Sequence, residues 1–202
     1  TVTGYLEIEN SIAPSINLSN CTSIGDELYI HDNDDLESID LSALQTVDSY
    51  VYIYENNDLE SVDLSSLETV DSYFYIQSHD YLESVDLSSL TEVASTFYLY
   101  QNDMLYDMEL PLLESIGGSL EIYYHYSNGI ETFYAPVLES VGGSVYIYYN
   151  QNLQEMDLSS LTEIGSQLYI YQADQLNVLE LGLLEEVGSS LYIYGSDQLE
   201  SI

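Results

Sequence analysis

Hydrophobic and polar residues alternate in short tetrads that recur along the whole chain. In the tetrad 51–54, Val51 and Ile53 alternate with tyrosines, the period of two expected for a β-strand with one buried and one exposed face. Equivalent tetrads begin at Leu6, Leu28, Val51, Phe74, Phe97, Leu120, Val145, Leu168 and Leu191. Their starts lie 22 to 25 residues apart, most often 23, and this regular spacing predicts a repeat architecture.

Two further apolar stretches complete each repeat. A block with leucine-rich LxxLxL spacing begins eight residues after the tetrad start, as in 36–41, 59–64, 82–87 and 153–158, and a third apolar pair follows, as in Leu44 and Val47. One coil cannot bury these side chains without neighbours above and below. The sequence therefore predicts an all-β parallel β-solenoid of about nine 23-residue coils, forming a single array over residues 1–202. Because residues 199–202 still follow the repeat, we expect the array to be open at one or both ends.

Two local features depart from a plain repeat. Cys21 is the only cysteine and falls in the slot of Leu44, so we expect a buried, inert side chain and no internal disulfide. The one 25-residue spacing places two extra residues in 124–129, which we expect to bulge from the surface.

The charge is one-sided: 36 Asp and Glu residues stand against no Lys or Arg, a formal charge of −36. Nucleic acids and anionic membrane surfaces both attract proteins through Lys and Arg, so neither is an expected partner. No stretch reaches the 18 apolar residues of a membrane helix, and we expect no membrane insertion. Cations are the expected small partners, and apolar burial must hold the fold together.

The repeat resembles receptor L-domains, the leucine-rich-like modules of insulin- and growth-factor-receptor ectodomains and of fungal cell-wall glycoproteins. Residues 59–76 and 153–170 carry the pattern Leu-x-Ser-Ile/Val-Asp-Leu-Ser-x-Leu-x-x-Val/Ile-Gly-x-x-Leu-x-Ile, with Asp71 and Phe74 as departures in the first and Glu155 and Met156 in the second. The resemblance implies a secreted or cell-surface, non-catalytic protein acting in adhesion, ligand capture or wall architecture. It transfers no ligand site to any residue.

The outward tetrad positions predict two tyrosine columns along the stack, one of them interrupted by Glu121 and the other by His31 and Gln77. Such columns form when stacked tyrosines merely support one another, but a contiguous aromatic strip also marks an interaction surface. The candidate occupants are a protein neighbour, which includes another copy of the chain, or a glycan. The candidate binding residues are Tyr29, Tyr52, Tyr54, Tyr75, Tyr98, Tyr100, Tyr123, Tyr146, Tyr148, Tyr169, Tyr171, Tyr192 and Tyr194, with His125 as a further candidate in the bulged loop.

Carboxylates form another predicted column on the LxxLxL strand. Its members are Asp40, Asp63, Asp86, Glu109, Asp157 and Glu180. Calcium prefers such oxygen ligands, and we take Asp40, Asp63, Asp86 and Glu109 as candidate calcium ligands. The alternative is a solvated acidic face, since no Asp-x-Asp-x-Asp-Gly loop is present.

Little in the sequence points to catalysis. The three histidines lie in different coils without an evident repeated partner, and His31 takes a position in a tyrosine column. We therefore expect a non-enzymatic extracellular structural or adhesive protein that assembles head to tail into a filament or matrix, with the tyrosine strip for lateral contacts. A cell-surface module that binds a ligand or carbohydrate is the alternative. Asn17 and Asn20 match the glycosylation pattern, which matters only in a eukaryotic secretory route.

Overall fold

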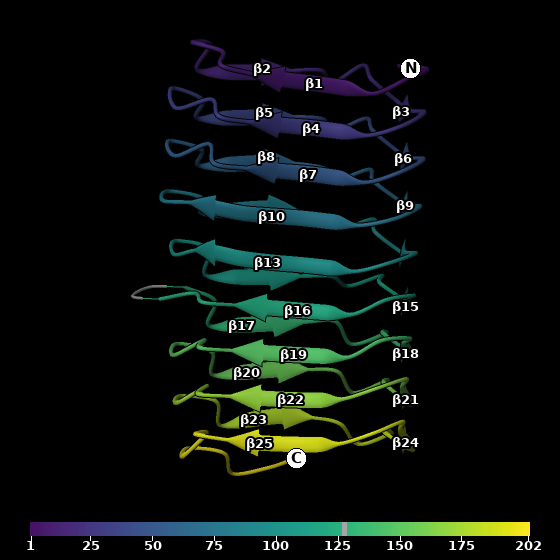
Figure 1. The fold of residues 1–202 in the computed structure, drawn as a ribbon, viewed down its shortest axis with the longest axis vertical. Helices are drawn as coiled ribbons and strands as arrows, with labels where there is room; N and C mark the ends of the chain where they lie inside the picture. Colours follow the sequence, from purple (N-terminus) through teal and green to yellow (C-terminus); the bar gives the residue numbers. More distant parts are fainter. Residues whose placement is uncertain (127–128) are drawn as a thin grey trace.

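The chain folds into a parallel β-solenoid (Figure 1). The structure is a computed structural model that describes residues 1–126 and 129–202. All strand pairs are parallel and join residues about one repeat apart, as in Tyr52 with Tyr75. The predicted fold class is therefore confirmed. Neighbouring strands of the nine-stranded sheet are one turn of the coil apart, so the sheet spans about eight turns.

Each of the first eight coils contributes a strand to each of three walls, and β25 adds a ninth strand to the first wall. The first wall, the long sheet, consists of β1 (Leu6–Glu9), β4 (Leu28–His31), β7 (Val51–Tyr54), β10 (Phe74–His79), β13 (Phe97–Asn102), β16 (Leu120–Tyr123), β19 (Val145–Tyr148), β22 (Leu168–Tyr171) and β25 (Leu191–Tyr194). Two-residue strands form the second wall: β3 (Ser23–Ile24), β6 (Thr46–Val47), β9 (Thr69–Val70), β12 (Glu92–Val93), β15 (Ser115–Ile116), β18 (Ser140–Val141), β21 (Glu163–Ile164) and β24 (Glu186–Val187).

The third wall is divided into two four-stranded sheets. The first contains β2 (Ser15–Asn17), β5 (Ser38–Asp40), β8 (Ser61–Asp63) and β11 (Ser84–Asp86). The second contains β14 (Asp107–Glu109), β17 (Thr132–Tyr134), β20 (Glu155–Asp157) and β23 (Val178–Glu180). Figure 1 shows the second set lying lower than its partner strands in the long sheet, as with β17 below β16.

The division is visible in the backbone hydrogen bonds. Leu64 N donates to Asp86 O at 3.0 Å, and Leu110 N donates to Tyr134 O at 2.8 Å, but the described residues include no equivalent bond from Leu87 to the next coil. The inward residue at the centre of the strand changes at the same point. It is Ile16, Ile39, Val62 and Val85 in the first four coils and Met108, Phe133, Met156 and Leu179 in the next four. Longer side chains change how far a strand can sit from the opposite wall.

Aliphatic and aromatic side chains fill the interior. Val51 and Ile53 are fully buried, whereas the alternate residues Tyr52 and Tyr54 are half-buried. Phe74 and Phe97 stack inside the solenoid with ring centroids 5.0 Å apart and an interplanar angle of 11°. The prediction that Cys21 is buried is confirmed, with 8% of its surface exposed.

A column of buried polar side chains runs beside the long sheet, at Asn33, Asn56, His79, Asn102, His125 and Asn150. We call it the polar ladder. Each member follows a residue with positive φ, which turns the chain out of the long sheet. The side-chain amide of Asn56 donates to Ile30 O at 3.0 Å, and that of Asn102 donates to Ile76 O at 3.0 Å. The ladder therefore adds side-chain hydrogen bonds between coils at the end of the long-sheet strands.

Candidate functional site

The outward side chains of the long sheet form the tyrosine face. Strand register aligns its first column as Glu7, Tyr29, Tyr52, Tyr75, Tyr98, Glu121, Tyr146, Tyr169 and Tyr192. The second column consists of Glu9, His31, Tyr54, Gln77, Tyr100, Tyr123, Tyr148, Tyr171 and Tyr194. The structure thus places the thirteen predicted tyrosines in two adjacent columns, while their role as a binding surface stays a prediction.

The rings of the tyrosine face pack closely on one another. Tyr169 and Tyr192 stack at 4.7 Å between ring centroids, and Tyr75 meets Tyr98 edge to face at 5.1 Å. Most of these side chains are half-buried, and the exposed fraction reaches 44% for Tyr192 and 56% for Tyr194 only in the last coil. Mutual packing leaves the face as a continuous aromatic layer.

Several hydroxyls of the tyrosine face, Tyr98 and Tyr148 among them, have a raised pKa. Burial and neighbouring negative or phenolic groups raise the pKa of Tyr98 to about 12. Burial also raises the pKa of Tyr148 to about 12, with a contribution from its hydrogen bond to Tyr169. The face therefore offers hydrogen-bond donors beside aromatic surfaces, a combination that suits glycans and protein partners alike.

Two hollows open on the tyrosine face. One has a volume of about 290 Å³ and is lined by Tyr123, Tyr124, Tyr146, Tyr148, Gln167 and Tyr169. Within it, the Tyr146 hydroxyl donates to Gln167 Oε1 at 3.1 Å. The other, of about 260 Å³, is lined by Tyr52, Tyr75, Gln77, Tyr98 and Glu121. Each hollow combines ring faces with an amide, so both can present apolar surface and hydrogen bonds to a small ligand.

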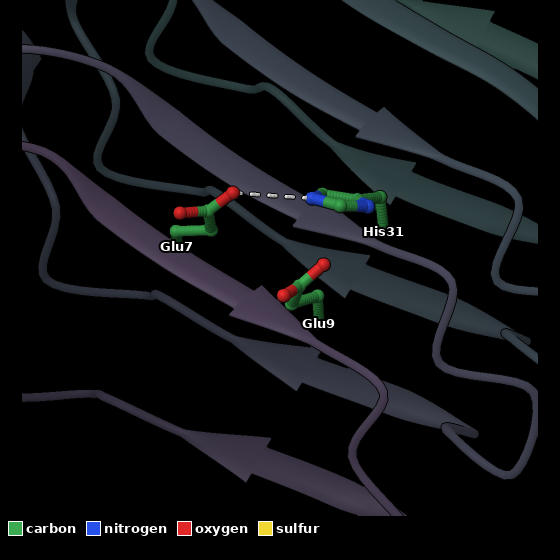
Figure 2. A group of neighbouring side chains, drawn as sticks. All are labelled: Glu7, Glu9 and His31. Carbon is green, nitrogen blue, oxygen red and sulfur yellow. Dashed lines mark hydrogen bonds and ion pairs between the residues drawn. The ribbon is translucent and has the colours of Figure 1, made fainter.

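Figure 2 shows the group in which Glu7, Glu9 and His31 lie together at one end of the tyrosine face. Their candidate ligand atoms lie within 4.8 Å of one another, the only such group that could hold a metal among the described residues. His31 Nε2 lies 3.4 Å from Glu7 Oε1, and Nδ1 lies 2.7 Å from Asp32 Oδ2. His31 also stacks on Tyr54 with ring centroids 4.7 Å apart.

The electrostatics of this group favour a protonated histidine. Burial lowers the pKa of His31, but the hydrogen bonds and charges of Asp32 and Glu7 together raise it more, so the pKa stands above its ordinary value. When His31 is protonated, both of its N–H groups face carboxylates and its charge neutralises part of the local negative charge. In that state neither ring nitrogen has a lone pair for a metal.

The predicted acidic column is continuous over only part of its length. Asp40, Asp63 and Asp86 are in register, but Glu109 belongs to the other four-stranded sheet, so the expected single column through these four residues is wrong. Tyr134 lies between Glu109 and Asp157 in the second sheet, which the sequence reasoning also missed. The cause is the break in strand pairing between the fourth and fifth coils.

The aspartates of this column have a structural role in the turns. Asp40 Oδ1 accepts hydrogen bonds from Ser42 N at 3.1 Å and Ser42 Oγ at 2.7 Å, which lower the pKa of Asp40. Asp63 Oδ1 accepts from Ser65 N at 3.0 Å in the same way. In such turns one oxygen of the carboxylate accepts a hydrogen bond from the residue two positions further along the chain. The sequence signal was the recurrent Asp-Leu-Ser.

A slot of about 390 Å³ marks the break between β11 and β14. Its lining includes Glu83, Asp86, Asp107 and Glu109, together with Tyr106, which is 39% exposed. The slot follows from tertiary packing and was not predicted. It places four carboxylates around strand edges that are not paired with each other.

His125 is a correction to the predicted binding surface. Its side chain is fully buried in the polar ladder, so the expectation of an accessible ligand contact is wrong. His79 is its equivalent, and burial lowers the pKa of each to about 4. The sequence signal was an Asn or His at 33, 56, 79, 102, 125 and 150, one in each of six coils. The predicted bulge at 124–129 lies partly outside the described residues.

In comparisons with protein-family models, with curated proteins and with solved structures, nothing matches this chain. The resemblance to receptor L-domains therefore stays a prediction. Within residues 1–126 and 129–202, no helix is long and apolar enough to span a membrane.

Proposed function

We propose that this chain is a non-enzymatic, extracellular structural or adhesive repeat protein whose tyrosine face makes lateral contacts in a filament or matrix. The continuous aromatic layer on one wall carries the proposal. Exposed tyrosines supply large contact areas at low entropic cost, and extended aromatic surfaces on soluble proteins are typical of interaction sites.

The same proposal includes head-to-tail stacking of copies. Within the solenoid each coil pairs its strands with those of the next coil, as Tyr169 pairs with Tyr192, and a second copy could continue this pairing. Such a contact is heterologous, and it produces an open filament unless the rotation closes a ring.

Calcium is proposed as a bridging ion between molecules rather than as a resident cofactor. The net charge of −36 makes copies repel one another, and divalent cations screen and bridge carboxylates more strongly than sodium at equal ionic strength. Asp40, Asp63 and Asp86 form the longest uninterrupted run of stacked aspartates in the third wall.

Electron microscopy of the purified protein, with calcium and with chelator at matched ionic strength, tests this function. We expect continuous filaments or sheets with calcium and their loss on chelation. Tyr169→Thr and Tyr171→Thr should abolish lateral association, because both side chains lie on the tyrosine face. Tyr134→Thr is the matched control, since Tyr134 is 43% exposed on the third wall. Discrete short rods under both conditions would overturn self-assembly.

A glycan-binding surface module is the second candidate, favoured by the 290 Å³ hollow in which Gln167 lies among tyrosines. Aromatic faces bind sugar rings, and the amide and hydroxyl groups supply directional hydrogen bonds. A glycan array followed by titration tests it. Saturable binding that is lost in Tyr148→Thr but kept in Tyr134→Thr would favour this candidate over assembly.

A further inference from the structure

Glu121 occupies the position at which a carboxylate replaces a tyrosine within the first column of the tyrosine face. Strand register places it between Tyr98 in the preceding coil and Tyr146 in the following coil. The neighbouring Tyr123 hydroxyl lowers the pKa of the Glu121 carboxyl, against the larger opposite effect of burial. An acidic group therefore lies among aromatic rings, half-buried, rather than on the solvated acidic wall.

The shorter glutamate side chain contributes to a hollow in the aromatic layer. Glu121, Tyr52, Tyr75, Gln77 and Tyr98 line it, with a volume of about 260 Å³. Three aromatic rings and one carboxylate thus border a single small space. Tyr75 and Tyr98, which both line it, meet edge to face with an interplanar angle of 89°.

Among the residues that the structure describes, no basic side chain pairs with the Glu121 carboxylate. The sequence contains no Lys or Arg, and the neighbouring Tyr123 is a neutral phenol. Burial of Glu121 raises the pKa of its carboxyl because the charged form loses hydration. A cation that enters the hollow from outside would restore the lost electrostatic stabilisation.

The chemistry of the lining selects among cations. Calcium takes six to eight oxygen ligands, whereas the hollow offers one carboxylate beside ring faces and phenolic hydroxyl groups. Aromatic faces attract weakly hydrated organic cations, above all quaternary ammonium groups held between several rings. A carboxylate beside those rings adds direct charge attraction.

We propose that the hollow at Glu121 binds a small quaternary ammonium compound, with the cationic methyl groups against Tyr52, Tyr75 and Tyr98 and the charge beside the Glu121 carboxylate. This site takes its ligand within one molecule, so the proposal does not depend on filament formation. It assigns a function to the one carboxylate that interrupts the aromatic column between its two tyrosine segments.

Ligand-observed NMR tests the proposal on protein shown to be monomeric by sedimentation. Tetramethylammonium or choline is added to the protein in place of an equal amount of sodium, so that the ionic strength stays constant. We expect upfield shifts and broadening of the ligand methyl signals, since bound methyl groups lie against ring faces. The neutral isostere 3,3-dimethylbutanol should bind at least about tenfold more weakly, because it lacks the charge on which cation–π attraction depends.

Two substitutions separate site binding from general attraction to a polyanion. Glu121→Gln keeps the shape of the side chain, and Glu121→Tyr restores the residue that the column carries elsewhere, so both should fold. Each should weaken tetramethylammonium binding about tenfold or more. Glu180→Gln removes one charge from the third wall and should leave binding unchanged. Equal binding by all four proteins, or equal affinity for the neutral isostere, would overturn the proposal.

Discussion

His79 Nε2 lies 3.2 Å from Ile53 O. This contact is equivalent to the one in the preceding coil, where the Asn56 side-chain amide donates to Ile30 O. His79 Nδ1 lies 3.3 Å from the backbone N–H of Asn56, which donates to it. The neutral imidazole with its proton on Nε2 satisfies both contacts, and burial favours this neutral form of the histidine in the polar ladder. His125 occupies the same place two coils later, with Asn102 N donating to its Nδ1 at 3.3 Å.

Acid stability should depend on these two histidines. Their pKa falls from 6.5 to about 4 on folding, so the unfolded chain binds more protons between these values and stability is lost as pH falls through this range. At about 1.4 kcal/mol per pKa unit, each histidine costs the native state about 3 kcal/mol by pH 4.

The variant His79→Asn/His125→Asn replaces both with the residue that the ladder uses elsewhere. We expect urea denaturation to show a smaller loss of unfolding free energy from pH 7 to pH 4 than in the unsubstituted protein. Neutralisation of surface carboxylates affects both proteins alike, so the difference isolates the histidines. Parallel pH profiles would contradict the burial of neutral imidazoles.

The turn role of the aspartates can be separated from their charge at Asp63. Asp63→Asn and Asp63→Ala remove the same charge, but only asparagine keeps an oxygen that can accept from Ser65 N. The free energy of unfolding of Asp63→Asn should exceed that of Asp63→Ala by about 1 kcal/mol. Equal midpoints in urea denaturation would mean that this hydrogen bond contributes nothing.

Close contact between coils should make Gly142 intolerant of a side chain. A Cβ atom there would lie 2.3 Å from Gly117 O, a clash with rigid backbone. Gly142→Ala should lower the unfolding free energy by about 1–3 kcal/mol. Gly182→Ala is the matched control, because a Cβ there meets nothing within 4 Å. Similar thermal midpoints for the two variants would show that the coils can move apart at this corner.

The break in the third wall should appear in amide hydrogen exchange. Leu64 N donates to Asp86 O at 3.0 Å, whereas Leu87, which lines the slot between β11 and β14, has no equivalent bond among the described residues. We expect Leu87 to exchange at least about tenfold faster than Leu64 under native conditions. Comparable protection of both amides would indicate that the two sheets pair in solution.

The sequence by itself determined the architecture and the direction of most side chains. A period of two within each tetrad and a period of about 23 between tetrads leave one way to bury Val51, Ile53 and their equivalents, which is to stack the coils in register. The same periods place Tyr52 over Tyr75, and the structure has that pairing.

Only the tertiary structure decided which outward-facing or polar side chains are buried, and at which coil the strand pairing of the third wall is interrupted. His125 reads as a loop residue in the sequence, yet the positive-φ turn at Tyr124 directs it into the interior. The break at β11 and β14 coincides with the change from Val85 to Met108 at the strand centre, and the hollow at Glu121 depends on rings from neighbouring coils. Such features arise from side-chain volumes summed across coils, which no pattern within one repeat contains.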